Sequence, residues 1–66
     1  MAYVYDTLQF FKYEHLPERL QVISKPFAEL ANQLAVDLPS GAEVSAGLRK
    51  LLEAKDCFVR AALNKQ

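Results

Sequence analysis

The chain has 66 residues, of which 52% are hydrophobic, and its eight basic and eight acidic side chains cancel to zero net charge. A chain this short forms one domain at most and usually needs a disulfide, a metal or a partner chain for stability. With Cys57 as its single cysteine and His15 as its single histidine, an internal disulfide and a structural zinc site are excluded, which leaves self-association. Zero net charge argues against DNA binding, and no apolar run is long enough to span a membrane, so a cytosolic protein is expected.

The first 13 residues contain five of the seven aromatic side chains and neither glycine nor proline, which predicts a short helix at about residues 2–12. The aromatic residues lie close in sequence to the cations Lys12, His15 and Arg19. Flat rings beside cations suit a nucleobase and its phosphate, but aromatic side chains in such a helix also commonly cover a core. Both interpretations stay open from the sequence, as does a simple packing or capping role for His15.

A second helix is predicted over residues 17–37. Pro17 and Glu18 suit a first helical turn. Apolar residues then recur at helical spacing and form one stripe about 100° wide: Leu20, Ile23, Phe27, Leu30, Ala31 and Leu34. Pro26 lies inside this helix and removes a backbone hydrogen bond, which predicts a kink around residues 22–26. The kink either curves the helix around a core or aims Lys25 at a ligand.

The segment DLPSGAEVS, residues 37–45, is the only clear loop signal. Pro39 and Gly41 end the second helix, Ser40 is expected to cap the next one, and Glu43 is placed to complete a capping box. A third helix is predicted over residues 42–64. Two helices joined by a short turn form an antiparallel hairpin. The expected fold is therefore all-α, a single domain over residues 1–66.

The third helix carries more apolar surface than one partner helix can cover. On a helical wheel Arg49, Glu53, Asp56 and Arg60 form a narrow polar strip, and the apolar residues spread over most of the rest: Leu48, Leu51, Leu52, Ala54, Phe58, Val59, Ala61, Ala62 and Leu63. One partner covers about 100°, so we expect the surplus to be buried in an obligate homo-oligomer. Lys55 points into the apolar arc and must reach solvent, pair with a carboxylate or meet an anion at an interface.

The sequence lacks the signatures of an enzyme. It has no glycine-rich phosphate loop, no HExxH and no GxSxG, so no catalytic residue, metal or cofactor is predicted. Arg49–Glu53 and Asp56–Arg60 are spaced for ion pairs along a helix. Alternatively, one of these arginines gives up its pair to bind a phosphate. Cys57 is interpreted as a core residue.

Four motifs occur in a recognisable order: YEHLPERLQ at residues 13–21, Ile23 with ELA at 29–31, LPSG at 38–41, and SxxLRKLLEA…VRAAL over 45–63. In these motifs the chain resembles the phage anti-CBASS protein 2 family of cyclic-oligonucleotide sponges. The resemblance implies an all-helical protein that assembles as a hexamer in the cytoplasm of the infected bacterium. It also implies binding, without cleavage, of cyclic dinucleotides such as cyclic GMP–AMP, and in some members of cyclic trinucleotides at separate sites. Sequestration of these messengers would block activation of the defence effector.

The resemblance also suggests site residues. Tyr13 matches an aromatic residue that contacts the dinucleotide, Lys25 lies in the region of a contacting lysine, and Arg49 and Lys50 match the LRK run as candidates for phosphate contacts near the assembly axis. Together with the aromatic and cationic residues noted above, the candidate nucleotide-binding residues are Tyr13, Phe11, His15, Arg19, Lys25, Arg49 and Lys50. The alternative function is a small helical adaptor that binds a host or phage protein through its apolar face. An enzyme acting on cyclic nucleotides ranks third.

Overall fold

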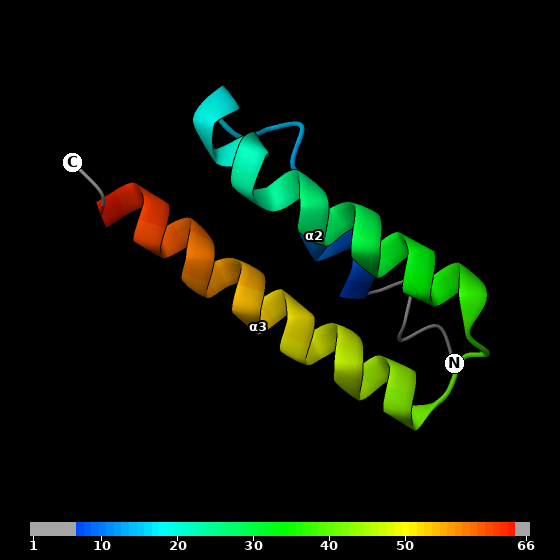
Figure 1. Cartoon of the computed structure of the whole chain (residues 1–66). Coiled ribbons are helices and arrows are strands. Elements are labelled where there is room, and N and C mark those ends of the chain that lie inside the picture. The colour runs from blue at the N-terminus through cyan, green and yellow to red at the C-terminus, as the bar shows by residue number, and fades with distance from the viewer. Residues whose placement is uncertain (1–6, 65–66) are drawn as a thin grey trace.

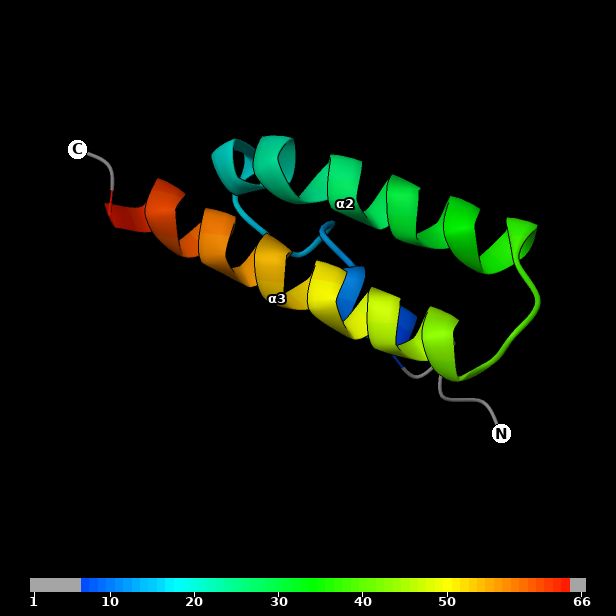
Figure 2. The ribbon, with the colours of Figure 1, turned by 60° about the horizontal axis from the view of Figure 1, so that its bottom comes forward.

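A computed structural model of the chain describes residues 7–64, which form a helical hairpin with a short N-terminal segment beside it (Figure 1). The elements are a 3-10 helix η1 (Gln9–Phe11) and two α-helices, α2 (Glu18–Asp37) and α3 (Ala42–Asn64). α2 and α3 run antiparallel, and η1 packs against α2 on one side of the hairpin (Figure 2). Within residues 7–64 there is no strand, so the all-helical expectation is confirmed.

The ends of α2 follow from local backbone chemistry. Pro17 is the N-cap, and its carbonyl oxygen accepts hydrogen bonds from the backbone N–H groups of Leu20 (2.9 Å) and Gln21 (3.0 Å). The helix therefore begins one residue later than predicted. It continues unbroken through Pro26 and ends where Leu38 becomes extended (φ −115°, ψ 145°), directly before Pro39.

The start of α3 corrects one prediction. The backbone N–H of Ser45 donates to the carbonyl oxygen of Gly41 at 2.9 Å, which closes the first turn of the helix. The residue whose carbonyl accepts the first helical bond is the N-cap. Gly41 therefore occupies this position, and the prediction that Ser40 caps the helix is wrong. Gly41 takes the position without the positive φ that glycine alone adopts easily.

The N-terminal helix is shorter than predicted in the part that the structure describes. The backbone is helical at Thr7 and Leu8, tightens into η1, and leaves the helix at Lys12 (φ −59°, ψ 140°). Positions 2–6 of the predicted helix lie outside the described residues. The segment ends with Phe11 turned into the hairpin, where only 1% of this residue is exposed.

The hydrophobic core joins all three elements. Its buried cluster consists of Phe11 from η1, Ala28 and Ala31 from α2, and Leu48 from α3. The two alanines have short side chains, which leaves room between the helices for the large ring of Phe11. The N-terminal segment thus completes a core that the hairpin alone would leave open.

The buried face of α2 is rotated relative to the predicted apolar stripe. Ser24 and Ala28, which lie outside that stripe, are 0% and 5% exposed, whereas Leu30, which belongs to it, is 45% exposed. The reason is that α2 packs against two partners. α3 covers the side of the predicted stripe, and η1 covers the adjacent side that includes Ala28.

α3 leaves much of its apolar surface exposed within a single chain. Leu48 is its only buried residue among those described, and Phe58 and Leu63 are 57% and 50% exposed. Phe58 stacks on Phe27 of α2 with ring centroids 5.8 Å apart, and Val22 of α2 is 69% exposed. Phe58 therefore presents apolar surface of the kind that commonly contacts another molecule, whereas Val22 lies about 140° from Phe27 around α2 and faces a different direction.

Candidate functional site

A pocket of about 340 Å³ lies between η1, the turn that follows it and α2. Its lining residues are Leu8, Gln9, Phe11, Lys12, Tyr13, Glu14, Ala28 and Asn32. Ala28 contributes only a methyl group to the wall on α2, so the side chains of the turn surround a hollow. The pocket combines an aromatic ring, a cation, a carboxylate and two amides with apolar walls.

The turn that carries Tyr13 and Glu14 is held by hydrogen bonds. The backbone N–H of Leu16 donates to the carbonyl oxygen of Tyr13 at 3.0 Å. From the first turns of α2, the side-chain amide Nε2 of Gln21 donates to the carbonyl oxygens of Leu16 (2.8 Å) and Glu14 (3.3 Å). The backbone N–H of Tyr13 donates to Oε1 of Glu14 at 3.4 Å. The turn is therefore fixed to the helix, which gives the half-buried ring of Tyr13 a defined place in the pocket wall.

α2 supplies the opposite wall of the pocket. Asn32 lies one turn after Ala28, and its amide Nδ2 donates to the carbonyl oxygen of Ala28 at 2.7 Å. Lys25 is exposed and lies three residues before Ala28, so helical periodicity places it on the same side of α2. Lys25 is therefore positioned near the pocket, although it does not line it.

The candidate residues predicted from the sequence are only partly brought together. Tyr13 lines the pocket with its ring half-exposed, and His15 lies exposed in the turn two residues later. Phe11 also lines the pocket, but it is a core residue that is 1% exposed, which leaves its ring without a free face for stacking on a base in this structure. The alternative, that the aromatic residues cover a core, holds for Phe11.

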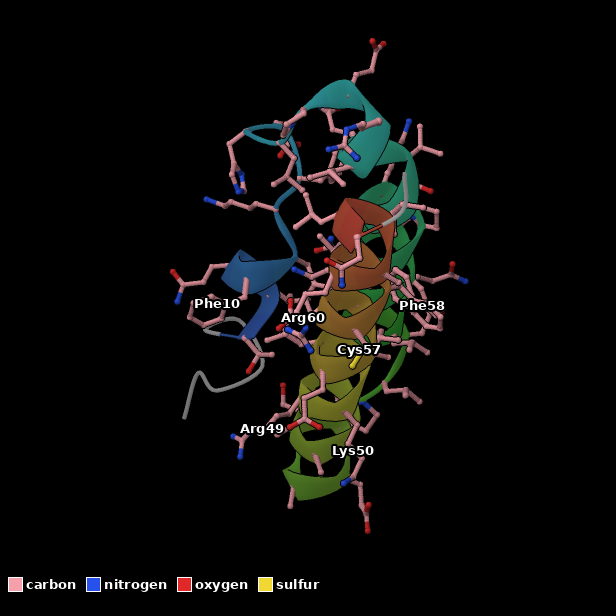
Figure 3. The ribbon with its side chains drawn as sticks, turned by 90° about the vertical axis from the view of Figure 1, so that its left-hand side faces the viewer. Phe10, Arg49, Lys50, Cys57, Phe58 and Arg60 are labelled. Atoms are coloured by element: carbon pink, nitrogen blue, oxygen red, sulfur yellow. The ribbon has the colours of Figure 1, made fainter. Side chains whose placement is uncertain are left out.

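The candidate arginines do not line this pocket. Arg19, in the first turn of α2, donates from a guanidinium nitrogen to the carbonyl oxygen of Ala62 near the end of α3 (3.5 Å). Arg49 and Lys50 are exposed in the first half of α3, about 20 Å from Ala62 along the helix axis. Their side chains extend toward different sides of α3 (Figure 3). Neither Arg49 nor Lys50 lines the pocket beside Tyr13 within one chain.

Lys55 has a structural partner on each side. Its ammonium group donates to the carbonyl oxygen of Phe10 at 3.1 Å and pairs with Oδ1 of Asp56 at 3.1 Å, and its side chain is only 12% exposed. Lys55 thus tethers η1 to α3. The sequence left three options for its ammonium group, namely solvent, a carboxylate or an anion, and the structure shows pairing with a carboxylate.

The polar strip of α3 differs from the prediction. No ion pair joins Arg49 to Glu53 or Asp56 to Arg60 among the described residues, since Asp56 pairs with Lys55 instead. A guanidinium nitrogen of Arg60 lies 3.5 Å from the sulfur of Cys57. The interpretation of Cys57 as a core residue is wrong, because the thiol is exposed. Cys57 lies on the side of α3 that no second helix covers in one chain (Figure 3).

Three polar lining residues, Gln9, Glu14 and Asn32, were not among the site residues predicted from the sequence. Glu14 and Asn32 look like ordinary solvated residues in the sequence, yet both line the pocket. A signal for Asn32 is its position four residues after Ala28, which is a buried small residue on the same helix face. Glu14 has no comparable signal beyond its place next to Tyr13.

A second pocket, of about 280 Å³, lies where the loop joins the two helices. Its lining residues are Leu34, Leu38, Glu43, Val44, Gly47, Leu48 and Leu51. Because Glu43 is its one charged lining residue, this pocket offers no cation for an anionic ligand. The pocket beside Tyr13 is therefore the better candidate for a nucleotide.

The residues that the structure describes contain neither a candidate metal site nor a helix able to cross a membrane. Among residues 7–64, no three His, Cys, Asp or Glu side chains gather where they could hold a metal ion. Neither described α-helix combines the length and the apolar character needed to cross a membrane. Comparisons of the chain with protein-family models, with curated proteins and with solved structures found no match.

Proposed function

We propose that the protein is a phage anti-defence sponge, which binds cyclic dinucleotides, and cyclic trinucleotides at further sites, without cleaving them. The observation that carries this proposal is the pocket in which the half-exposed ring of Tyr13 lies beside Lys12 and apolar walls. An aromatic face and a cation are what a base and its phosphate require. The resemblance of residues 13–63 to the anti-CBASS protein 2 family points to the same class of ligand.

The size of the pocket supports a site shared between copies of the chain. Small-molecule sites commonly have volumes of about 300–1,000 Å³, and this pocket, at about 340 Å³, is at the lower end of that range. It suits one base better than a whole cyclic dinucleotide. A second copy of the chain would supply the pocket for the second base, as in a two-fold symmetric assembly.

The cations are distributed in a way that fits such an assembly. Lys12 lines the pocket, and Lys25 lies on the adjoining face of α2. Arg49 and Lys50 do not line this pocket within one chain, so in our proposal they contact phosphates bound by a neighbouring subunit. The exposed apolar side chains of α3, including Phe58, would be covered in the proposed hexamer.

Isothermal titration calorimetry against cyclic GMP–AMP, cyclic di-GMP, cyclic di-AMP and cyclic trinucleotides tests the proposal. After titration the protein is denatured by heat and the released ligand is identified by chromatography. Tight binding with intact ligand supports a sponge, whereas degraded ligand indicates an enzyme. The absence of binding to every nucleotide refutes the proposal.

Tyr13 provides the matched variants for this experiment. Tyr13→Ala removes the stacking ring and should weaken dinucleotide binding about ten- to a hundredfold, since stacking contributes about 1–3 kcal/mol per base. Tyr13→Phe keeps the ring and should bind within a few-fold of the wild type. If Tyr13→Ala binds as tightly as the wild type, Tyr13 does not contact the ligand.

The second candidate function is a helical adaptor, which the exposed apolar side chains favour. Phe58 on α3 is 57% exposed in one chain, and such a side chain suits a groove on a host or phage protein as well as another subunit. The two functions are separated by the calorimetry together with light scattering. An adaptor is monomeric in isolation and gives no heat with any nucleotide.

A further inference from the structure

Two residues that line the pocket beside Tyr13, Asn32 and Glu14, have side-chain oxygens that can accept hydrogen bonds. The side chain of Asn32 lies with Nδ2 2.7 Å from the carbonyl oxygen of Ala28. A carbonyl oxygen only accepts, so the group facing it must be the amide NH₂ rather than the amide oxygen. The amide oxygen Oδ1 of Asn32 is therefore directed away from Ala28 as a free acceptor.

Glu14 provides a second acceptor at the same pocket. Its Oε1 accepts one hydrogen bond, from the backbone N–H of Tyr13 at 3.4 Å, and within residues 7–64 no cation pairs with its carboxylate. An ionised carboxylate has about four lone-pair sites, so most of its acceptor capacity is unused. The carbonyl oxygen of Glu14 is held by Gln21 (3.3 Å), which keeps this residue at the edge of the pocket.

The bases differ in what they present to two acceptors. The Watson–Crick edge of guanine carries two adjacent donors, the N1–H and the 2-amino group, beside the O6 acceptor. Adenine presents only its 6-amino group, next to the N1 acceptor, which a carboxylate would repel. Single-stranded nucleotides are read in this way, with a ring stacked on an aromatic side chain and its edge hydrogen-bonded.

We infer that the pocket beside Tyr13 is a guanine site in which Glu14 and Asn32 read the base. In this arrangement the Glu14 carboxylate accepts from the N1–H and the 2-amino group, Oδ1 of Asn32 accepts from the remaining amino hydrogen, and Lys12 faces O6 or N7. The inference rests on the proposed nucleotide-binding function. It assigns a preference for guanine-containing cyclic dinucleotides and two specificity-determining residues.

Calorimetry with three ligands and three proteins tests this inference. The ligands are cyclic di-GMP, cyclic di-AMP and cyclic di-IMP, the last of which lacks the 2-amino group. The proteins are the wild type, Glu14→Gln and the control Glu29→Gln, which changes an exposed carboxylate of α2 that does not line the pocket. Circular dichroism and light scattering of each variant check that fold and assembly are retained.

The wild type should bind cyclic di-GMP at least about tenfold more tightly than the other two ligands, which is the effect expected of a charge-assisted hydrogen bond. Glu14→Gln should lose about tenfold in affinity for cyclic di-GMP and gain affinity for cyclic di-AMP, because the amide of glutamine can donate to N1 of adenine. Glu14→Gln should also distinguish cyclic di-GMP from cyclic di-IMP less than the wild type does, because the charged partner of the 2-amino group is lost while Oδ1 of Asn32 remains. Glu29→Gln should behave as the wild type.

Failure of this inference differs from failure of the proposed function. If the wild type binds all three ligands equally, or if Glu14→Gln weakens all of them alike, Glu14 does not read guanine and the sponge proposal stands. If the wild type binds none of these ligands and no other cyclic nucleotide, both proposals are overturned.

Discussion

Replacement of Ser24 by alanine should stabilise the protein. Ser24 lies in α2 with 0% of its surface exposed, and its hydroxyl oxygen has no hydrogen-bond partner. A buried polar group without a partner has lost its hydrogen bonds to water and gained none in return. Alanine keeps the Cβ and removes only the unpaired hydroxyl.

The expected gain can be estimated from three contributions. Relief of the unsatisfied hydroxyl contributes about 1–3 kcal/mol. Alanine is the better helix former by about 0.5 kcal/mol, whereas the small void left by one oxygen atom costs about 0.3 kcal/mol. The free energy of unfolding should therefore rise by about 1–3 kcal/mol, which in a domain of this size raises Tm by at least about 4 °C.

Thermal unfolding followed by circular dichroism at one fixed protein concentration measures this effect. Ser45→Ala is the matched control, because it makes the same chemical change in α3 at a half-exposed position. Its effect should stay within about 0.5 kcal/mol. A Tm for Ser24→Ala that is unchanged, lower, or raised no more than in Ser45→Ala would refute the reasoning from burial.

Three further substitutions test other parts of the structure. Gly47→Ala should raise the free energy of unfolding by about 0.5–1 kcal/mol in urea titrations, because an added Cβ meets no heavy atom within 4 Å; a loss of stability would contradict this. Lys55→Met removes the hydrogen bond to Phe10, so the backbone amides of η1 should exchange with solvent about tenfold faster. Lys50→Met is the control. Equal exchange rates in the two variants would argue against the tether. Phe58→Glu puts a charge on the exposed apolar surface and should reduce the mass measured by light scattering, while an unchanged mass would place Phe58 outside any subunit interface.

The helices of the hairpin could be predicted closely because their limits are set by local chemistry. Pro17 has no N–H to donate and therefore suits a helix start, and Pro39 and Gly41 interrupt the helical pattern before α3 begins. These effects act over a few residues of sequence and need no knowledge of the tertiary structure. The observed α2 and α3 consequently lie within one residue of the predicted limits.

The faces of the helices were harder to predict because they depend on what packs against them. Hydrophobic periodicity placed Leu30 inside and gave no reason to bury Ser24, but η1 adds a second partner for α2 and rotates its buried face. Cys57 shows the same limitation. Its neighbours in the sequence are largely apolar, which suggested a core position, but no second helix covers it and the thiol is exposed.

The candidate site was predictable in part. The aromatic residues near cations were an unusual local pattern, the family resemblance singled out Tyr13 among them, and Tyr13 lines the pocket. Glu14 and Asn32 were not found, since an isolated carboxylate or amide in the sequence is most often solvated. Their proximity arises only when the turn after η1 folds back onto α2.

The order of residues in the core has a consequence for the newly made chain. Phe11 leaves the ribosome well before Leu48, the partner it meets on α3. The ring of Phe11 therefore lacks part of its core contacts until α3 has been translated. Of the described elements, η1 is thus synthesised first and completes its packing last, and during that interval its apolar ring is exposed to non-native contacts.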